Sequence, residues 1–461
     1  MTRTFRARAL LPALAVLAFS SAQAAEDNSP ASGESLASGE TLADFFSAAI
    51  DYSPRLRIAE ENLNVVAARK RMATGNLLPQ VSAAASITEN RRTALDPFFQ
   101  VDRLRVFDGE RSYLRLSQTL FNWQAFSMRK QAGLTEDQVE AEYFYELAFL
   151  LTDVAERYFN VLQAQDALDS IAAELEAVSN QLDQVESMFD LQLAQITDFY
   201  QAQANLASVQ AQQLQLESDL ALAHEALRAI SGLEPGRLHT LRDEIEMPDL
   251  EGDVEFWVET ALANNQQIRA RQFAERVANE RISERMGAYF PQLSIVAMRQ
   301  NTNVGFDNAP IDQSDITYLG LDITIPIYSG GSQTAQVREA RSQHRIAEHD
   351  LRRVELEARE IVRSAYLQSV SGDTLIEAAE ALVESTELSA EAMQQGLELG
   401  TVTTVDVFIA LRDRFRAERD LQRARYDQIK AMLVLRREAG TLEAEDLLEV
   451  GEWLEAPRPR P

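Results

Sequence analysis

Apolar residues follow an alternation of three- and four-residue steps over two long stretches of the chain. The first stretch ends at Phe189, breaks near residues 190–198 and resumes as far as Ile230, and a second stretch ends at Leu397. A repeat of 3.5 residues keeps one apolar seam facing a partner helix. The pattern therefore predicts long helices that fold back at short turns into antiparallel coiled-coil hairpins. The seam of the first arm consists of Leu168, Ile171, Leu175, Val178, Leu182, Val185 and Phe189.

Other stretches alternate apolar and polar side chains residue by residue. In residues 318–325, leucine and isoleucine occupy every second position, and residues 113–120 and 293–298 alternate in the same way. A period of two residues is typical of β-strands. Together with the turn residues between them, these stretches predict two β-hairpins, at about 80–121 and 292–328, and four strands in the chain.

The chain also contains an internal repeat. Residues 45–80 align without gaps on residues 257–292, an offset of 212 (257 minus 45), so that Pro79-Gln80 falls on Pro291-Gln292. A repeat of this length is far longer than a solenoid unit and indicates the duplication of a whole unit within a single fold. Three further pairs repeat at an offset of 208 (366 minus 158): Tyr158 and Tyr366, Asp198 and Asp406, and Gly232 and Gly440.

The predicted fold is α+β and mainly α. Each repeat begins with a helix (about 40–77 and 252–289), continues with a β-hairpin and ends with a long helical hairpin. Pro79, Pro291 and Pro326 mark the junctions between helix and strand, because proline disfavours helix for the residue before it. The predicted parts are repeat one at 40–236 with its tip at about 190–198, a linker at 237–251, repeat two at 252–440 with its tip at about 398–406, and a C-terminal segment at 441–461.

The first residues have the pattern of a secretory signal. Three arginines precede an apolar run, Ala9–Phe19, and Ala22-Gln23-Ala24 provides an A-x-A cleavage site. A bilayer-spanning helix needs about 20 apolar residues, so a retained anchor helix is the less favoured interpretation. We expect a signal peptide at residues 1–24, a flexible segment at 25–39 and an exported mature chain.

Composition excludes several classes of function. The chain has no cysteine, which excludes disulfides, thiol catalysis, cysteine-ligated metals and a lipoprotein anchor. A net charge of −28 argues against a nucleic-acid partner, because phosphate binding needs a basic surface. The four histidines lack the i,i+4 spacing of a paired metal site, and the common catalytic motifs are absent from the sequence. We therefore expect no enzyme activity, no cofactor and no metal site.

Four amphipathic strands cannot close a barrel, and an open sheet leaves its edge strands unpaired. In lipid, an unpaired backbone group finds no water to bind. Symmetric association solves this problem when several chains contribute four strands each to one closed barrel. The helical arms would then continue outside the membrane.

These features together resemble the TolC-like outer-membrane efflux proteins. The resemblance covers about Leu36 to Glu449 and rests on the duplicated order, the Leu-Pro-Gln and Phe-Pro-Gln steps, and Ile325–Gly331. The turns Leu191–Asp198 and Leu399–Val407 are similar to the helix-turn-helix tips of that family. The absence of cysteine matches its unlipidated branch.

The resemblance implies a homotrimer in the Gram-negative outer membrane, in contact with outer-membrane lipid. Three chains would build a 12-stranded barrel, and their helices would form a periplasmic tunnel. The tunnel would dock on a periplasmic adaptor (membrane fusion) protein and an inner-membrane pump of RND or ABC type. The protein would then be the passive exit duct of a tripartite efflux or type I secretion system. Drugs, metal ions and secreted polypeptides all remain open as substrates.

The resemblance also implies a gate at the tips. Asp406 matches an acidic ring at the periplasmic entrance of the family, and Asp198 is its counterpart in repeat one; such rings attract cations. The residues alone favour a simpler role, because acids in the first turn of a helix cap it and complement its dipole. Ile409 stands at a second acidic position, and apolar Leu397 and Val402 stand where the family has latch partners. The closed state would then depend on hydrophobic packing or on other pairs.

Residues 191–198 and 399–406 are expected to form the adaptor-docking surface, although exposed polar loops without a partner are the default for such turns. Gly400 suits a turn with positive φ, whereas its counterpart is Gln192, so the two tips should differ in shape. The docking residues are Leu191, Gln192, Leu193, Thr197, Leu399, Gly400, Thr401 and Thr404.

The main alternative is a soluble periplasmic coiled-coil adaptor or scaffold. Such a protein would combine a single helical hairpin with a separate lipoyl-like β-domain. The sequence instead predicts duplicated hairpins beside the helices and no such domain.

Overall fold

The computed structural model describes residues 41–95, 98, 102–192, 194–242, 250–305 and 308–456. The predicted signal peptide, the segment 25–39 and Leu193 lie outside these residues. The chain divides into two compact units. The first unit contains the residues up to Ile58, Tyr143–Ile268 and the residues from Glu355 onward, and the second contains Ala59–Glu142 and Arg269–Val354.

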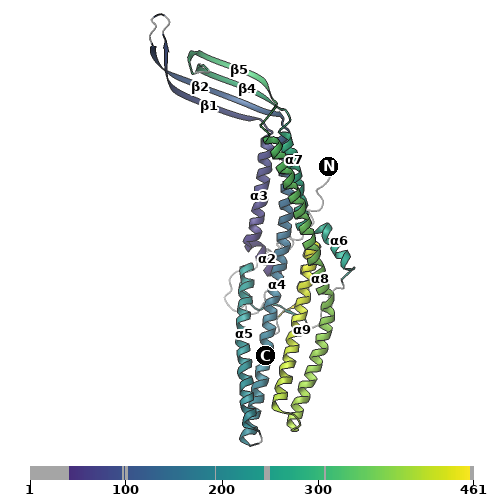
Figure 1. Cartoon of the computed structure of the whole chain (residues 1–461). Helices are drawn as coiled ribbons and strands as arrows, with labels where there is room; N and C mark the ends of the chain where they lie inside the picture. The colour runs from purple at the N-terminus through teal and green to yellow at the C-terminus, as the bar shows by residue number, and fades with distance from the viewer. Residues whose placement is uncertain are drawn as a thin grey trace, which may run out of the picture. The chain divides into compact units, whose positions relative to one another are not determined.

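The helices and strands occur in the same order in both halves of the chain (Figure 1). The first half consists of α2 (Leu42–Tyr52), α3 (Pro54–Gly75), β1 (Gln80–Leu95), β2 (Asp102–Phe121), α4 (Trp123–Asp190) and α5 (Ile196–Ser231). The second half consists of α6 (Val254–Asn264), α7 (Gln266–Gly287), β4 (Gln292–Val304), β5 (Pro310–Thr324), α8 (Ser332–Glu398) and α9 (Thr404–Ala439). The α2 and α6 starts differ by 212 (254 minus 42), and the α5 and α9 starts by 208 (404 minus 196). The mainly helical fold with two β-hairpins is confirmed.

Each repeat begins with two helices, so the prediction of one helix over 40–77 and over 252–289 is wrong. Pro54 has no N–H to donate, and Ser53 before it is extended, with φ −64° and ψ 113°. No proline follows α6. There, Asn265 leaves the helical conformation, with φ −58° and ψ 123°, and its Oδ1 accepts from the backbone N–H groups of Gln267 (2.8 Å) and Ile268 (3.1 Å). A side-chain cap thus makes the same break that proline makes in repeat one.

The second unit contains a four-stranded antiparallel sheet with the order β1-β2-β4-β5. The two predicted hairpins are joined along β2 and β4, where Leu116 faces Ala297. Within the described residues, the outer strands β1 and β5 each pair on one side only. The second hairpin was predicted to reach residue 328, but β5 ends at Thr324, because Pro326 cannot donate to a strand ladder.

One face of this sheet carries a row of apolar residues across all four strands. The registers align Val81 with Leu116, Leu116 with Ala297, and Ala297 with Leu319. No other part of the described chain covers this row: the exposed fraction is 65% for Val81 and 77% for Leu319. The adjacent row on the opposite face is more polar and contains Ser82 and Arg115. The sheet therefore has one face suited to a nonpolar environment.

The first unit is helical and has its core along the predicted seams. Ile171, Val178 and Val185 of α4 are buried against Ala202 and Val209 of α5. In the second hairpin, Ala390 of α8 is buried with Val407, Leu411 and Phe415 of α9. The coiled-coil prediction is thus confirmed by burial of its apolar positions. Across the part of the chain that the structure describes, no helix has the combined length and hydropathy needed to cross a bilayer.

Around the base of these hairpins, α2 and α10 (Ala444–Glu452) close a larger aromatic core. The ring of Tyr158 contacts Phe45 and Phe159 at centroid distances of 5.8 and 5.9 Å. The linker strand β3 (Thr240–Leu241) pairs with β6 (Leu454–Glu455) close to the C-terminus. These contacts tie the inter-repeat linker to the helices of the first unit.

Candidate functional site at the hairpin tips

The tip between α8 and α9 is a compact turn closed by backbone hydrogen bonds. Gly400 has φ 71°, a left-handed conformation that glycine adopts without steric cost. The N–H of Thr401 donates to the carbonyl of Gly396 (2.9 Å), and the N–H of Gly400 donates to that of Leu397 (3.0 Å). This pattern satisfies the free carbonyls at the helix end.

Asp406 and Thr403 form a reciprocal cap at the start of α9. Oδ2 of Asp406 accepts from the backbone N–H of Thr403 (2.9 Å) and from its hydroxyl (2.6 Å), while the N–H of Asp406 donates to Oγ1 of Thr403 (3.3 Å). The Thr403 hydroxyl, followed by its backbone N–H, holds the pKa of Asp406 below its usual value. The carboxylate therefore stays charged at neutral pH, and the capping role that the residues alone predicted is present.

A hollow of about 200 Å³ lies beside this cap, between α8 and α9, with Asp406 on its wall. Asp413 lines the same hollow, as do Met393 and Ile409. Sequence reasoning overlooked Asp413, although a seven-residue spacing from Asp406 places both carboxylates on one face of a helix. A second carboxylate therefore lines this hollow two turns along α9, and Ile409 lies between the two.

Leu397 and Val402, the apolar residues at the expected latch positions, pack within their own hairpin. Both are partly buried against the cluster that contains Ala390 and Val407. Leu399 is not part of this cluster and is 78% exposed. Thr401 lies exposed in the turn, and Thr404 is half-buried in the first turn of α9.

The tip between α4 and α5 has the same length, but the hydrogen bonds that cap its second helix are fewer and longer. Gln192 takes the left-handed position, with φ 62°, and its N–H donates to the carbonyl of Phe189 (2.8 Å). Oδ2 of Asp198 accepts from the backbone N–H of Gln195 (3.3 Å), where a glutamine replaces the capping threonine. Leu191 is 71% exposed, and Thr197 is exposed on the first turn of α5. The predicted tip residues within the described part of the chain thus lie together at the two turns.

The three prolines expected at helix-to-strand junctions all lie next to strands, but Pro326 is six residues before α8 (332 minus 326). β1 starts directly after Pro79, and β4 directly after Pro291. At the first junction, Nε2 of Gln80 donates to the carbonyl of Gly75 (2.8 Å), and at the second, the Phe290 ring lies 5.7 Å from that of Trp123. Pro326 follows the end of β5.

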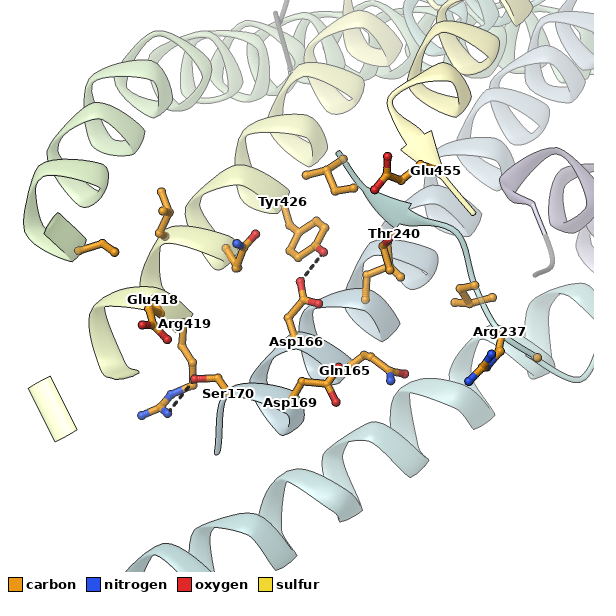
Figure 2. A pocket seen from close by; sticks show the side chains of 17 residues that line it. Gln165, Asp166, Asp169, Ser170, Arg237, Thr240, Glu418, Arg419, Tyr426 and Glu455 are labelled. Atoms are coloured by element: carbon orange, nitrogen blue, oxygen red, sulfur yellow. Dashed lines mark hydrogen bonds between the residues drawn. The ribbon is translucent and has the colours of Figure 1, made fainter. Parts of the chain in front are cut away.

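A polar cleft of about 710 Å³ lies away from the tips, between α4, α9 and the inter-repeat linker. Figure 2 shows Asp166 of α4 and Tyr426 of α9 pointing toward each other across it, and the tyrosine hydroxyl donates to Oδ2 of Asp166 (2.6 Å). Burial raises the pKa of Asp166 to about 6, although the bond from Tyr426 opposes this shift. Nearby, Arg419 donates to Glu174 (2.9 Å). No sequence pattern indicates this cleft, because its residues are far apart in the chain.

Comparison with known proteins connects the duplicated fold to one family. The outer membrane efflux protein family matches residues 46–233 and 257–441. The outer membrane protein TolC of Vibrio cholerae is 28% identical over 419 residues, covering 89% of this chain and 93% of the relative. TolC of Escherichia coli is 27% identical over 421 residues, which cover 88% of this chain and 83% of that relative. The alkaline protease secretion protein AprF of Pseudomonas aeruginosa is 26% identical over 412 residues, which cover 88% of this chain and 85% of that relative.

Solved structures share the fold. The Campylobacter jejuni CmeC outer membrane channel superposes with a TM-score of 0.77 at 15% identity, covering 93% of this chain and 95% of that one. The outer membrane protein VceC of Vibrio cholerae superposes with a TM-score of 0.74 at 20% identity, covering 87% of this chain and 96% of that one. The family match spans both repeats and well over half of the sequence. The chain therefore belongs to the outer membrane efflux protein family.

Proposed function

We propose that three copies of this outer-membrane efflux protein assemble into one exit duct. Each chain would add its four strands to a 12-stranded barrel in the lipid, and the helical hairpins would form the periplasmic tunnel. The duct conducts passively and catalyses no reaction. Its entrance would receive substrate from an inner-membrane pump through a periplasmic adaptor.

The observation that carries this proposal is the four-stranded sheet of the second unit. Its outer strands β1 and β5 lack a second neighbour within the described residues, and its apolar row from Val81 to Leu319 is open. Unpaired edges are unfavourable in lipid, and pairing β1 of one chain with β5 of the next removes them. The soluble adaptor alternative is not supported, because the family match spans both repeats.

Relatives named for efflux and relatives named for secretion both resemble this chain. AprF is an alkaline protease secretion protein, and TtgI of Pseudomonas putida is a toluene efflux pump outer membrane protein. A pump of either RND or ABC type therefore fits the proposal, with the pump selecting the substrate.

Adjacent substitutions on β5 test the barrel. Leu321 lies on the apolar face of the sheet and Asp322 on the opposite face. A cationic side chain on a lipid-facing strand costs about 2–4 kcal/mol at the bilayer midplane. Leu321→Arg should therefore reduce the trimeric, outer-membrane fraction strongly, while Asp322→Arg should not. Fractionation followed by light scattering of the detergent-extracted protein measures both. A parent protein that extracts as a monomer would overturn the proposal. An equal loss of the trimeric, outer-membrane fraction in the two variants would overturn it as well.

We propose further that Asp406, with Asp198 and Asp413, forms the cation-selective entrance of the trimer. Asp406→Asn removes the charge but keeps an oxygen that can accept from the N–H of Thr403, so capping is largely retained. Cation selectivity and block by divalent cations should both weaken in single-channel recordings. Ile409→Asn, one turn along the same helix, is the uncharged control. Unchanged selectivity in Asp406→Asn would contradict this role.

The docking surface can be tested by cross-linking in cells. A photoreactive residue at Leu191 or Leu399 should form adducts with a periplasmic adaptor. The same residue at Glu380, on the shaft of α8, serves as the control. Adaptor adducts that form equally at the shaft, or fail to form at the tips, would contradict docking at the tips.

A further inference from the structure

A histidine in the second unit lies between two carboxylates. Nε2 of His344 on α8 lies 2.5 Å from Oε1 of Glu275 on α7, and its Nδ1 lies 3.6 Å from Oε1 of Glu348. One ligand atom from each of the three residues falls within 4.8 Å of the others. We propose that Glu275, His344 and Glu348 bind a divalent transition-metal ion, with Zn²⁺ as the fitting example, and so link α7 to α8.

The backbone positions these ligands before any ion binds. His344 and Glu348 are four residues apart on α8 and therefore share one face of the helix. Contacts on both sides of the cluster hold α7 alongside α8. Arg271 pairs with Asp350 (3.6 Å) on one side, and Arg281 donates to Gln343 (3.2 Å) on the other. Glu275 faces Nε2 of His344 and Glu348 faces Nδ1. Zn²⁺ binds nitrogen and oxygen ligands at about 2.0–2.2 Å, so these side chains would rotate toward one ring nitrogen to bind the same ion.

The charges of the cluster favour a cation. Among the described residues, no lysine or arginine lies within ion-pair distance of Glu275 or Glu348. The neighbouring Arg271 pairs with Asp350, and Arg345 donates to Ser342 (2.9 Å). Two carboxylates together carry the charge that balances a divalent ion, and an imidazole binds such an ion through a nitrogen lone pair. An imidazole ligand favours zinc, copper or nickel over the oxygen-preferring Mg²⁺ and Ca²⁺.

The first repeat lacks this donor set at the equivalent positions. At the offsets of 208 and 212, His344 corresponds to Glu136, Glu348 to Glu140, and Glu275 to Leu63. Glu136 forms an ion pair with Lys70 of α3. In repeat one, a side-chain ion pair thus joins the two helices where repeat two presents the proposed metal ligands.

Zinc titration of the full mature protein tests the site. The detergent-extracted protein is stripped with EDTA, and ZnCl₂ is titrated by calorimetry. One tight Zn²⁺ site per chain is expected, with Co²⁺ giving the d–d absorption of a bound ion. His344→Gln and Glu275→Gln should each weaken Zn²⁺ binding by at least the ~10–100-fold that loss of an outer-shell partner typically costs.

His349→Gln is the matched control, because His349 is an exposed histidine on the same helix. It should leave the affinity and the stoichiometry unchanged. Zn²⁺ should also raise the melting temperature of the parent protein and of His349→Gln, but not that of His344→Gln. Equal melting temperatures without metal show that the variants are folded. Binding that survives His344→Gln, or falls equally in His349→Gln, would overturn the proposal.

Discussion

The two helical-hairpin tips have the same length and differ in how their turns are stabilised. In repeat two, Gly400 occupies the left-handed position and Thr403 caps α9 through its hydroxyl. In repeat one, Gln192 occupies that position, and Gln195 stands where the threonine would be. Asp198 and Asp406 nevertheless lie at the same point of their helices. Duplication has thus kept the backbone of the tips, while the side chains that stabilise each turn have diverged.

The same contrast extends to the polar groups of the shaft. Asp166 and Tyr426 form a hydrogen-bonded pair, and their counterparts at the offset of 208 are Thr374 and Ser218. This pair therefore exists once in the duplicated fold. The repeats share the apolar seams that determine the fold, and they differ at the polar positions where the two halves can take separate roles.

The largest expected effect comes from removing the unique Asp166 carboxylate. Its pKa is raised to about 6 from an ordinary 3.8, so the folded state disfavours the charged form. This cost is fully present above pH 6 and disappears below about pH 4. Asp166→Asn, which still accepts from Tyr426, should stabilise the protein on the order of 3 kcal/mol at pH 8 and hardly at all at pH 4. Denaturant unfolding at the two pH values measures the difference.

Asp169→Asn is the control for that prediction, because Asp169 is an exposed carboxylate on the same face of α4. It should stabilise the protein much less, because Asp169 is exposed and its charge is the smallest of the three influences on the Asp166 pKa. Equal stabilisation by Asp166→Asn at pH 4 and pH 8 would show that burial of the charge is not the cause.

A second prediction concerns the left-handed positions of the two turns. Gly400→Ala places a Cβ where φ is 71° and should destabilise its tip by about 1–2 kcal/mol. Gln192→Gly should do the opposite and stabilise its tip by up to about 1 kcal/mol, because it relieves the same strain. Hydrogen exchange at the turn amides reports both changes locally. If both substitutions raise, or both lower, the hydrogen-exchange rates at the turn amides, strain at the left-handed position does not distinguish the two tips.

The smallest effect should come from the caps. Thr403→Ala removes the hydroxyl that accepts from the Asp406 N–H, at a cost of about 1 kcal/mol. It should also raise the pKa of Asp406, since the Thr403 hydroxyl bond is the main reason that this pKa is low. Gln195→Ala should change its helix less. Exchange rates in the first turns of α5 and α9 compare the two, and a larger effect at Gln195 would contradict the assignment of the stronger cap.

The sequence predicted features that depend on local periodicity and missed those that depend on tertiary register. The seam residues Ile171 and Val178 and the alternation at Leu319 reflect periods of 3.5 and 2 residues, which a linear pattern carries. The break at Asn265 was missed because no proline marks it; a side-chain cap makes it.

Contacts between residues that are far apart in the chain could not be predicted from the sequence pattern. Asp166 meets Tyr426 across 260 residues, and Glu275 meets His344 across 69. Such pairs become visible only once the helices are aligned side by side. The His344–Glu348 spacing was readable on its own, yet two ligands on one helix do not define a site. Asp413 was also readable from its seven-residue spacing from Asp406.

The central claim is that three chains form one conducting duct in the outer membrane, and planar-bilayer recording of the purified full-length mature protein tests it most directly. Detergent-extracted trimers are predicted to insert and give uniform single channels that favour cations. A protein that extracts as a monomer from the outer membrane, or that inserts without producing channels, would contradict the account.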